Sequence, residues 1–260
     1  MADHTWTREE VLLCIRLYCK LPYKKLRQTT PEIVELAHLL GRTPSAISMR
    51  CCNYVQFDPV ESKRVKGFTN AAKLDTSVWA DVSTDWEKFA EESENLLETY
   101  RNNKTPHLSN NDKISNMEDE LPTGTTKEQM VRVRVGQRFF REAVLASYNY
   151  QCCITGISNT ALLIASHIKP WKDSDPKNDR TNPHNGLCLS PLYDKVFDIG
   201  LMSIDEQYRI IFAKSIHDCA SKNIINRFFG CYNGKPLKLP DRFIPDQKYL
   251  EYHRNNVFQI

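Results

Sequence analysis

A long polar segment near the middle, residues 101–126, constrains the fold of this 260-residue chain more than any other feature. Its sequence, RNNKTPHLSNNDKISNMEDELPTGTT, has almost no large apolar side chains and includes two prolines and a glycine. A segment of this composition contributes little to a packed core and is typical of a linker. We therefore predict two domains, residues 1–100 and residues 127–260.

The sequence of the first domain predicts helices. Thr7 and Glu10 fit a capping box ahead of the apolar run VLLCIRLY. Thr30 and the proline after it open PEIVELAHLL, which Gly41 ends. Thr43, again followed by proline, opens a third helix through SAISMRCCNYV. The first domain is therefore expected to be helical.

The second and third predicted helices are separated only by Gly-Arg-Thr, which is the layout of a helix-turn-helix unit. Such a unit places its second helix in the major groove of DNA. The side chains predicted to face DNA are Ser45, Ser48, Met49, Arg50 and Asn53. A plain three-helix bundle with no DNA role fits the same spacing, so both interpretations remain open.

The net charge of +3 says little about partners, but the distribution of charge favours a phosphate-binding protein. Residues 20–50 contain six basic and two acidic residues, and residues 127–141 contain five basic and one acidic. A solvated charged surface is the alternative explanation.

The composition also bears on the compartment. The chain contains no apolar run of about eighteen residues, and its start, MADHTWTREE, lacks the basic and apolar regions of a secretory signal. We therefore expect a cytoplasmic protein with no membrane partner. Its nine cysteines, an odd number, do not suggest a disulfide framework, so reduced and mostly buried thiols are expected.

The sequence after the linker contains both helix patterns and strand patterns. GQRFFREAVLASY predicts an amphipathic helix, ALLIAS and GLCL predict short strands, and LYDKVFDIG predicts a short helix that Gly200 ends. His167 follows the first strand, where Pro170 and Trp171 interrupt it, so we expect its side chain to face a cleft. Asn185 directly precedes the second strand.

Two carboxylates on the last of these helices can share one site. Asp194 stands nine residues beyond Asn185, and Asp198 follows at i+4 on the same helix face. Oxygen ligands favour Mg²⁺ or Mn²⁺ over zinc. Asp194 and Asp198 are therefore the predicted ligands of one divalent ion.

The order and spacing of His167, Asn185 and Asp194 resemble those of the HNH endonuclease family. The flanking sequence is also similar, in CITG, ASHIKPW, the Asn-Gly-Leu turn and YDKVFDIG. The resemblance covers residues 132–204, extends more weakly to YLEYHRNNVF, and is to the branch found in bacterial restriction-type proteins. It implies a ββα-metal fold, in which a two-stranded hairpin packs on a helix around one metal ion.

The resemblance implies a role for each site residue. His167 would be the general base that takes a proton from water, and the metal would stabilise the leaving 3′ oxygen. Asn185 is expected to hydrogen-bond across the loop and hold His167 in place. Lys169 and Arg180 are predicted phosphate contacts.

The sequence departs from the family at several positions. The third family position is often His, and here it is Asp194. The residue before the general base often binds the metal as Asp or His, and here it is Ser166, the predicted first ligand. The paired CxxC motifs that hold zinc in many members are missing, so no structural zinc is expected.

The sequence thus predicts an α+β protein with a helix-turn-helix-like N-terminal domain and a C-terminal ββα-metal nuclease domain. The predicted activity is metal-dependent hydrolysis of double-stranded DNA, in a restriction or defence role. A homodimer is expected, because one small site cuts one strand. Two alternatives remain: a DNA-binding regulator that has lost the activity, and a structure-specific or RNA nuclease.

Overall fold

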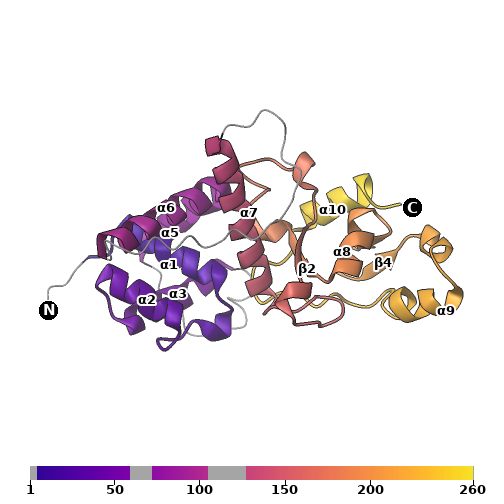
Figure 1. Ribbon diagram of the computed structural model, residues 1–260, viewed down its shortest axis with the longest axis horizontal. Helices are drawn as coiled ribbons and strands as arrows, with labels where there is room; N and C mark the ends of the chain where they lie inside the picture. Colours follow the sequence, from indigo (N-terminus) through magenta and orange to yellow (C-terminus); the bar gives the residue numbers. More distant parts are fainter. Residues whose placement is uncertain (1–4, 59–71, 105–126, 260) are drawn as a thin grey trace.

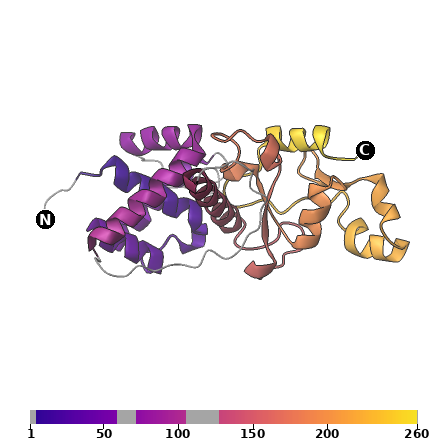
Figure 2. The same cartoon turned by 45° about the horizontal axis from the view of Figure 1, so that its top comes forward.

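The computed structural model describes residues 5–58, 72–104 and 127–259, which form an α+β fold, as the sequence predicts. The molecule is elongated, with the helices of the first half at one end and the mixed helices and strands of the second half at the other (Figure 1). Helix α7 (Lys127–Ser147) stands between these two ends in both ribbon views (Figures 1 and 2).

The described part of the first half is helical. Its helices are α1 (Arg8–Lys20), α2 (Pro31–Leu40), α3 (Pro44–Asn53), α5 (Lys73–Thr84) and α6 (Trp86–Lys104), with 3₁₀ turns at Tyr23–Lys25 and Tyr54–Phe57. Thr7 and Glu10 form the predicted capping box, Gly41 ends α2 with a φ of 65°, and Thr43 caps α3. Thr30 precedes α2 without capping it, because its hydroxyl donates to a carbonyl of the preceding turn.

The second half combines short strands with helices. After α7 come β1 (Ile164–His167), β2 (Gly186–Leu189), α8 (Pro191–Asp198), β3 (Met202–Ile204), β4 (Ile210–Phe212), α9 (Lys222–Ile225) and α10 (Gln247–Asn256). Short 3₁₀ turns lie at Thr160–Leu162, Trp171–Asp173, Pro183–Asn185 and Lys214–Asp218, and a π-helical turn at Asn226–Gly230. The predicted GLCL strand and the helix ended by Gly200 are both present.

The strand predicted for ALLIAS is shorter and begins later. Its first residues form the 3₁₀ turn Thr160–Leu162, and pairing begins only at Ile164. The Asn159 side chain accepts the Ala161 N–H at 3.0 Å, which favours a turn over an extended strand. From Ile164 the strand pairs antiparallel with β2, and His167 lies opposite Gly186. The hairpin therefore ends at the histidine.

The hydrophobic core consists of two clusters, and α7 contributes to both. Its Phe139 and Ala143 join the cluster formed by the N-terminal helices. Its Phe140 and Val144 join the cluster around the hairpin, α8 and α10. One helix therefore presents adjacent faces to the two halves of the molecule.

The two halves are more closely joined than a linker between domains would require. Phe243, near the C-terminus, belongs to the N-terminal cluster. The neighbouring Arg242, fully buried, donates to the carbonyl oxygens of Tyr18 and Leu21 at the end of α1. The backbone N–H of Trp86, at the start of α6, donates to the carbonyl of Lys177 at 3.0 Å.

The predicted linker begins too early. Residues 101–104 are the last turn of α6, where Arg101 pairs with Glu35 of α2 at 2.8 Å. A polar sequence is compatible with an exposed helix end as well as with a linker, so composition alone did not separate the two. Residues 105–126 lie outside the described residues.

All nine cysteines are free thiols, and Cys219 and Cys231 are exposed while most of the others are buried. Across the described segments, no helix is both long enough and apolar enough to cross a bilayer.

Candidate active site

A cleft of about 1480 Å³ is lined by five of the seven residues predicted for the nuclease site. Its walls come from the hairpin and the loop after β1, from the starts of α6 and α7, and from the ends of α8 and α10. The predicted residues that line it are Ser166, His167, Arg180, Asp194 and Asp198. Side chains from the hairpin and from α8, separated by almost thirty residues in sequence, therefore face one space.

Three neighbours fix the ring of His167. Its Nε2 lies 2.9 Å from the carbonyl oxygen of Arg180. A carbonyl can only accept, so Nε2 carries the hydrogen and Nδ1 is the basic nitrogen of the neutral ring. Phe140 of α7 stacks on the ring with centroids 3.9 Å apart, and Trp171 meets it edge-on at 5.5 Å. The tautomer and orientation are both set before any substrate binds.

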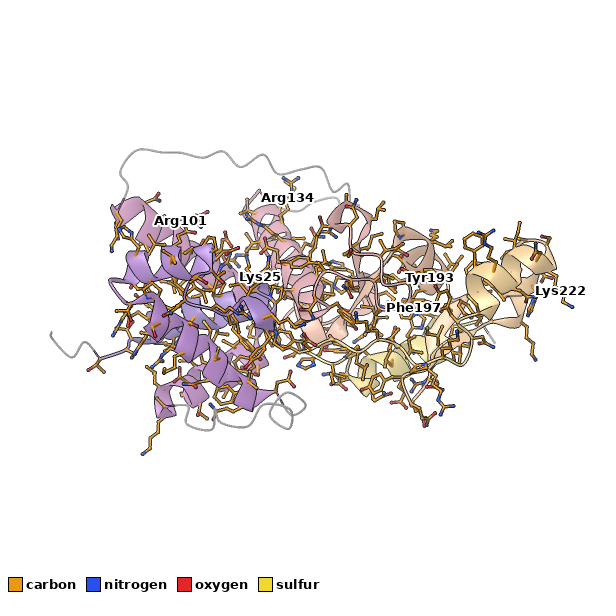
Figure 3. The ribbon with its side chains drawn as sticks, turned by 90° about the horizontal axis from the view of Figure 1, so that it is seen from below. Lys25, Arg101, Arg134, Tyr193, Phe197 and Lys222 are labelled. Atoms are coloured by element: carbon orange, nitrogen blue, oxygen red, sulfur yellow. The ribbon has the colours of Figure 1, made fainter. Side chains whose placement is uncertain are left out.

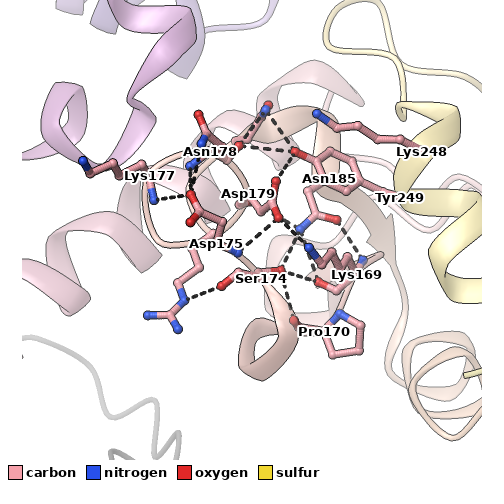
Figure 4. A network of polar contacts seen from close by, with 12 residues as sticks. Lys169, Pro170, Ser174, Asp175, Lys177, Asn178, Asp179, Asn185, Lys248 and Tyr249 are labelled. Carbon is pink, nitrogen blue, oxygen red and sulfur yellow. Dashed lines mark hydrogen bonds and ion pairs between the residues drawn. The ribbon is translucent and has the colours of Figure 1, made fainter. Parts of the chain in front are cut away.

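Asn185 is fully buried and ties together the loop that follows His167 (Figure 4). Its Oδ1 accepts the Lys169 N–H at 2.8 Å. Its Nδ2 lies 3.2 Å from the carbonyl oxygens of Lys169 and Asp179 and 3.4 Å from the Ser174 hydroxyl. The backbone carbonyl of Asn185 also accepts the Ile168 N–H. These are the cross-loop hydrogen bonds expected of this asparagine, while a contribution to catalysis stays a prediction.

Lys169 does not reach the cleft. Its ammonium pairs with Asp179 at 2.8 Å, and the Tyr249 hydroxyl donates to the same carboxylate at 2.9 Å (Figure 4). Burial by itself would raise the pKa of Asp179, but hydrogen bonds from Lys169, the Asp175 backbone and Tyr249 hold it below the ordinary value. Lys169 is thus engaged in the loop's own structure, and the structure does not bring it to the predicted phosphate position.

The two carboxylates of α8 lie in an environment that opposes their charge. Burial raises the pKa of Asp194, and burial together with the charge of Asp194 raises the pKa of Asp198 to about 6. Lys195 opposes both shifts. The Ser166 hydroxyl lies near enough to lower the pKa of Asp194, yet it is buried and makes no hydrogen bond of ordinary geometry with a described residue.

This donor set fits a hard divalent cation. Two carboxylates that repel each other and a buried hydroxyl are oxygen donors, which Mg²⁺ and Mn²⁺ prefer. Within residues 5–58, 72–104 and 127–259, no cluster of three or more His, Cys, Asp or Glu side chains forms a complete protein cage. Such a cage is not needed, because Mg²⁺ commonly binds one or two carboxylates and keeps several waters.

The predicted DNA-facing residues lie on α3, away from the cleft, and they differ in availability. Ser45 is exposed and Asn53 is half-buried. Ser48 donates to the Leu26 carbonyl at 2.8 Å. Arg50 pairs with the buried Asp75 at 2.6 Å and lies over the Trp6 ring. Ser48 and Arg50 are therefore engaged within the protein itself.

Sequence reasoning missed the site residues that α7 contributes. Phe140 stacks on His167, and Gln137 and Arg141 line the cleft beside it. The basic residues at 127–141 indicate phosphate binding, but their sequence pattern does not place them at the cleft. His253 was also missed. It accepts from the Ser203 hydroxyl and donates to the Phe197 carbonyl.

Comparison with known proteins gives a family match and a similar solved structure. No curated protein matches the sequence. Among solved structures, the "Modification dependent TagI restriction endonuclease" is similar, with 21% identity over 46% of this chain and a TM-score of 0.33. The match spans 38% of that protein, well under two thirds of its length. Residues 152–205, which carry β1, β2 and α8, match the family described as HNH endonuclease, so the recognition of an HNH endonuclease segment in this chain is confirmed.

Proposed function

We propose that this protein is a divalent-metal-dependent endonuclease that hydrolyses phosphodiester bonds in double-stranded DNA. One observation carries the proposal: His167, with its tautomer fixed, lines the same cleft as the carboxylates of Asp194 and Asp198. Metal-assisted phosphodiester hydrolysis requires a general base and oxygen ligands for the metal in one cleft.

In the proposed reaction a water oxygen forms a bond to phosphorus while the bond from phosphorus to the 3′ oxygen breaks. The proton of the water passes to Nδ1 of His167, whose other nitrogen is held by the Arg180 carbonyl. The leaving 3′ oxygen takes up a proton from solvent water, and His167 later returns its proton to solvent, so the products carry a 5′-phosphate and a 3′-hydroxyl. Phe140 and Asn185 hold the histidine and its loop in position.

Asp194 and Asp198 would hold Mg²⁺ or Mn²⁺, and the Ser166 hydroxyl would supply a further oxygen. When bound, the ion would neutralise phosphate charge and stabilise the leaving oxygen. Arg180, which also lines the cleft, remains the proposed phosphate contact of the predicted pair. Lys169 supports the loop instead.

We assign DNA recognition to the α2–α3 pair, with Ser45, Met49 and Asn53 as the contacts that remain accessible. A restriction or defence role in the cytoplasm of a bacterium is proposed from the sequence resemblance alone. A homodimer would allow one site to cut each strand of a duplex.

The test is cleavage of supercoiled plasmid with Mg²⁺ or Mn²⁺ by the wild-type chain, His167→Ala and His217→Ala. His217 is an exposed histidine that does not line the cleft, so it serves as the matched control. We expect His167→Ala to cut roughly 10²–10⁴-fold more slowly, the usual contribution of a general base, and His217→Ala to match the wild type.

The alternatives give different results in the same assay. A chain that binds plasmid but never cuts it with either metal would be a regulator. A chain that cuts only RNA or branched DNA would be a nuclease of another specificity. Equal cutting by His167→Ala and the wild type would reject the proposed site.

A further inference from the structure

One face of α7 forms a wall of the active-site cleft. The α7 side chains that line the cleft are Gln129, Arg132, Val133, Gln137, Phe140 and Arg141. Their spacing of three or four residues places them in one stripe along the helix. Other faces of the helix are buried in the two core clusters. The stripe therefore runs along the cleft and ends at the catalytic histidine.

Phe140 fixes where this stripe meets the site. Its ring stacks on His167 with centroids 3.9 Å apart, so the next residue, Arg141, is held beside the hairpin. The guanidinium of Arg141 lies 3.4 Å from the carbonyl oxygen of Thr160, just before β1. Burial raises the pKa of Cys188 in β2 to about 12, and the positive charge of Arg141 opposes that rise. These contacts locate Arg141 over the hairpin.

Arg141 differs from the other arginines of the cleft in its partners. Arg132 pairs with Glu91 of α6 at 2.8 Å. The Nε of Arg180 donates to the carbonyl oxygen of Ser174 at 3.2 Å, and its guanidinium lies over the Trp171 ring, 5.1 Å from the centroid. Arg141 has no carboxylate within ion-pair distance among the described residues, and its hydrogen bond to the Thr160 carbonyl, at 3.4 Å, is at the long end of the hydrogen-bond range. Most of the N–H donors of Arg141, which is half-buried beside the proposed phosphodiester site, are therefore available to a ligand.

We propose that Arg141 binds a phosphate of the DNA backbone next to the bond that is cut, with Gln137 one turn earlier as a second, neutral contact. The inference rests on the proposed function, because it takes DNA as the ligand of the cleft. The planar fork of a guanidinium matches two phosphate oxygens at once, which an ammonium cannot do. The contact is to the backbone and carries no sequence preference.

The experiment measures binding of the full chain to a short DNA duplex at several salt concentrations, in the presence of a chelator so that cleavage plays no part. The variants are Arg141→Gln, Arg141→Lys and the control Arg134→Gln. Arg134 carries the same charge on the same helix but is exposed and does not line the cleft (Figure 3). Circular dichroism checks that each variant is folded.

We expect Arg141→Gln to bind roughly tenfold more weakly at low salt. Its plot of log affinity against log salt should be shallower by about 0.9, the contribution of one phosphate contact. Arg141→Lys should recover the slope but only part of the affinity, since it keeps the charge and loses the fork. Arg134→Gln should keep the wild-type slope.

A slope for Arg141→Gln equal to that of the wild type would overturn the proposal, as would an equal loss in Arg134→Gln. Failure of the wild-type chain to bind the duplex at any salt would also overturn it. Absence of metal-dependent cutting, with the binding results as expected, would reject the proposed function and leave this contact standing.

Discussion

Asn185 shows how a single buried side chain can organise a loop. It has no exposed surface, and its amide joins Lys169, Ser174 and Asp179 of the loop between β1 and β2. We predict that Asn185→Ala lowers the free energy of unfolding by about 1–3 kcal/mol, because buried loop groups lose their partners. The cutting rate should fall roughly 10²-fold through misplacement of His167.

Asn185→Asp should be at least as harmful, because a carboxylate would face the carbonyl oxygens of Lys169 and Asp179. Urea unfolding and plasmid cleavage below the unfolding transition measure the two effects. The exposed Asn233→Ala should change neither. Wild-type cutting by a stably folded Asn185→Ala would show that the loop needs no such support.

At the residue scale, local sequence order indicates which residues could form one site, while their chemical roles stay predictions. His167, Asn185 and Asp194 were selected by spacing and flanking motifs, and the structure gathers them around one hairpin and one helix. Lys169 is a predicted phosphate contact, and Arg50 is a predicted DNA contact from its place on the second helix of the helix-turn-helix candidate, yet both pair within the protein. Their partners, Asp179 and Asp75, lie 10 and 25 residues away, and no local pattern indicates such pairs.

At the scale of elements, the packing of α7 on the hairpin depends on a missing side chain. Gly186 lies opposite His167 in the hairpin. A Cβ at this glycine would lie 2.3 Å from Val144 and 3.0 Å from Phe140, both on α7. We predict that Gly186→Ala costs about 1–3 kcal/mol in unfolding free energy by overpacking. It should also slow cutting, because the displaced Phe140 stacks on His167.

Gly136→Ala, within α7 itself, provides the control. Its Cβ would meet only the Thr181 side chain, at 3.2 Å, and alanine favours a helix over glycine by about 1 kcal/mol. Its stability and cutting rate should stay close to those of the wild type. Urea unfolding and plasmid assays that rank the two variants in the opposite order would contradict this packing.

The docking of α10 should give stability a dependence on pH. His253 is buried, stacks on Phe197 and accepts from Ser203, and burial lowers its pKa to about 4. The unfolded chain binds this proton near pH 6.5, so folding stability falls as pH decreases from about 6.5 to 4. The slope from this group is at most about 1.4 kcal/mol per pH unit.

His253→Gln should therefore lose less stability than the wild type when pH is lowered from 7 to 5. His217→Gln, at an exposed position, should follow the wild type. Urea unfolding at several pH values measures the difference. Parallel curves for His253→Gln and the wild type would mean that this histidine does not titrate on unfolding.

The ends of helices were more predictable from the sequence than the tertiary contacts of single side chains. Capping residues, Gly41 and Gly200 marked helix ends correctly, because they act through bonds within a few residues. The ALLIAS strand was misjudged where Asn159 favours a turn, and α6 continued into the predicted linker. Where local preferences compete, tertiary contacts decide, and these are absent from a pattern of single residues.

At the scale of the whole molecule, the two halves depend on each other. Phe139 and Ala143 of α7 and Phe243 of the C-terminal segment complete the N-terminal core. The Trp86 backbone also binds the loop that carries the Arg180 carbonyl, which in turn holds His167. The division into residues 1–100 and 127–260 therefore does not mark independent units of packing, and the helical half supports the geometry of the cleft.

Arg242 gives the sharpest test of this dependence. It is fully buried, lies over the Tyr18 ring, and donates to the Tyr18 and Leu21 carbonyls, where the dipole of α1 is negative. No local motif predicts that a residue near the C-terminus caps the first helix. We predict that Arg242→Gln lowers the unfolding free energy by about 3 kcal/mol, from lost charge-assisted hydrogen bonds. The exposed Arg209→Gln should change it by less than about 0.5 kcal/mol.

Urea unfolding of Arg242→Gln followed by two probes distinguishes shared from separate stability. Trp6, Trp79 and Trp86 report on the helical half, and Trp171 reports on the cleft. If the halves fold together, total fluorescence and the thiol labelling of Cys153 and Cys188, which are buried in the core cluster of the second half, will shift to lower urea by the same amount. A shift in the fluorescence transition alone, with labelling at the wild-type urea concentration, would show instead that the second half is stable without its neighbour.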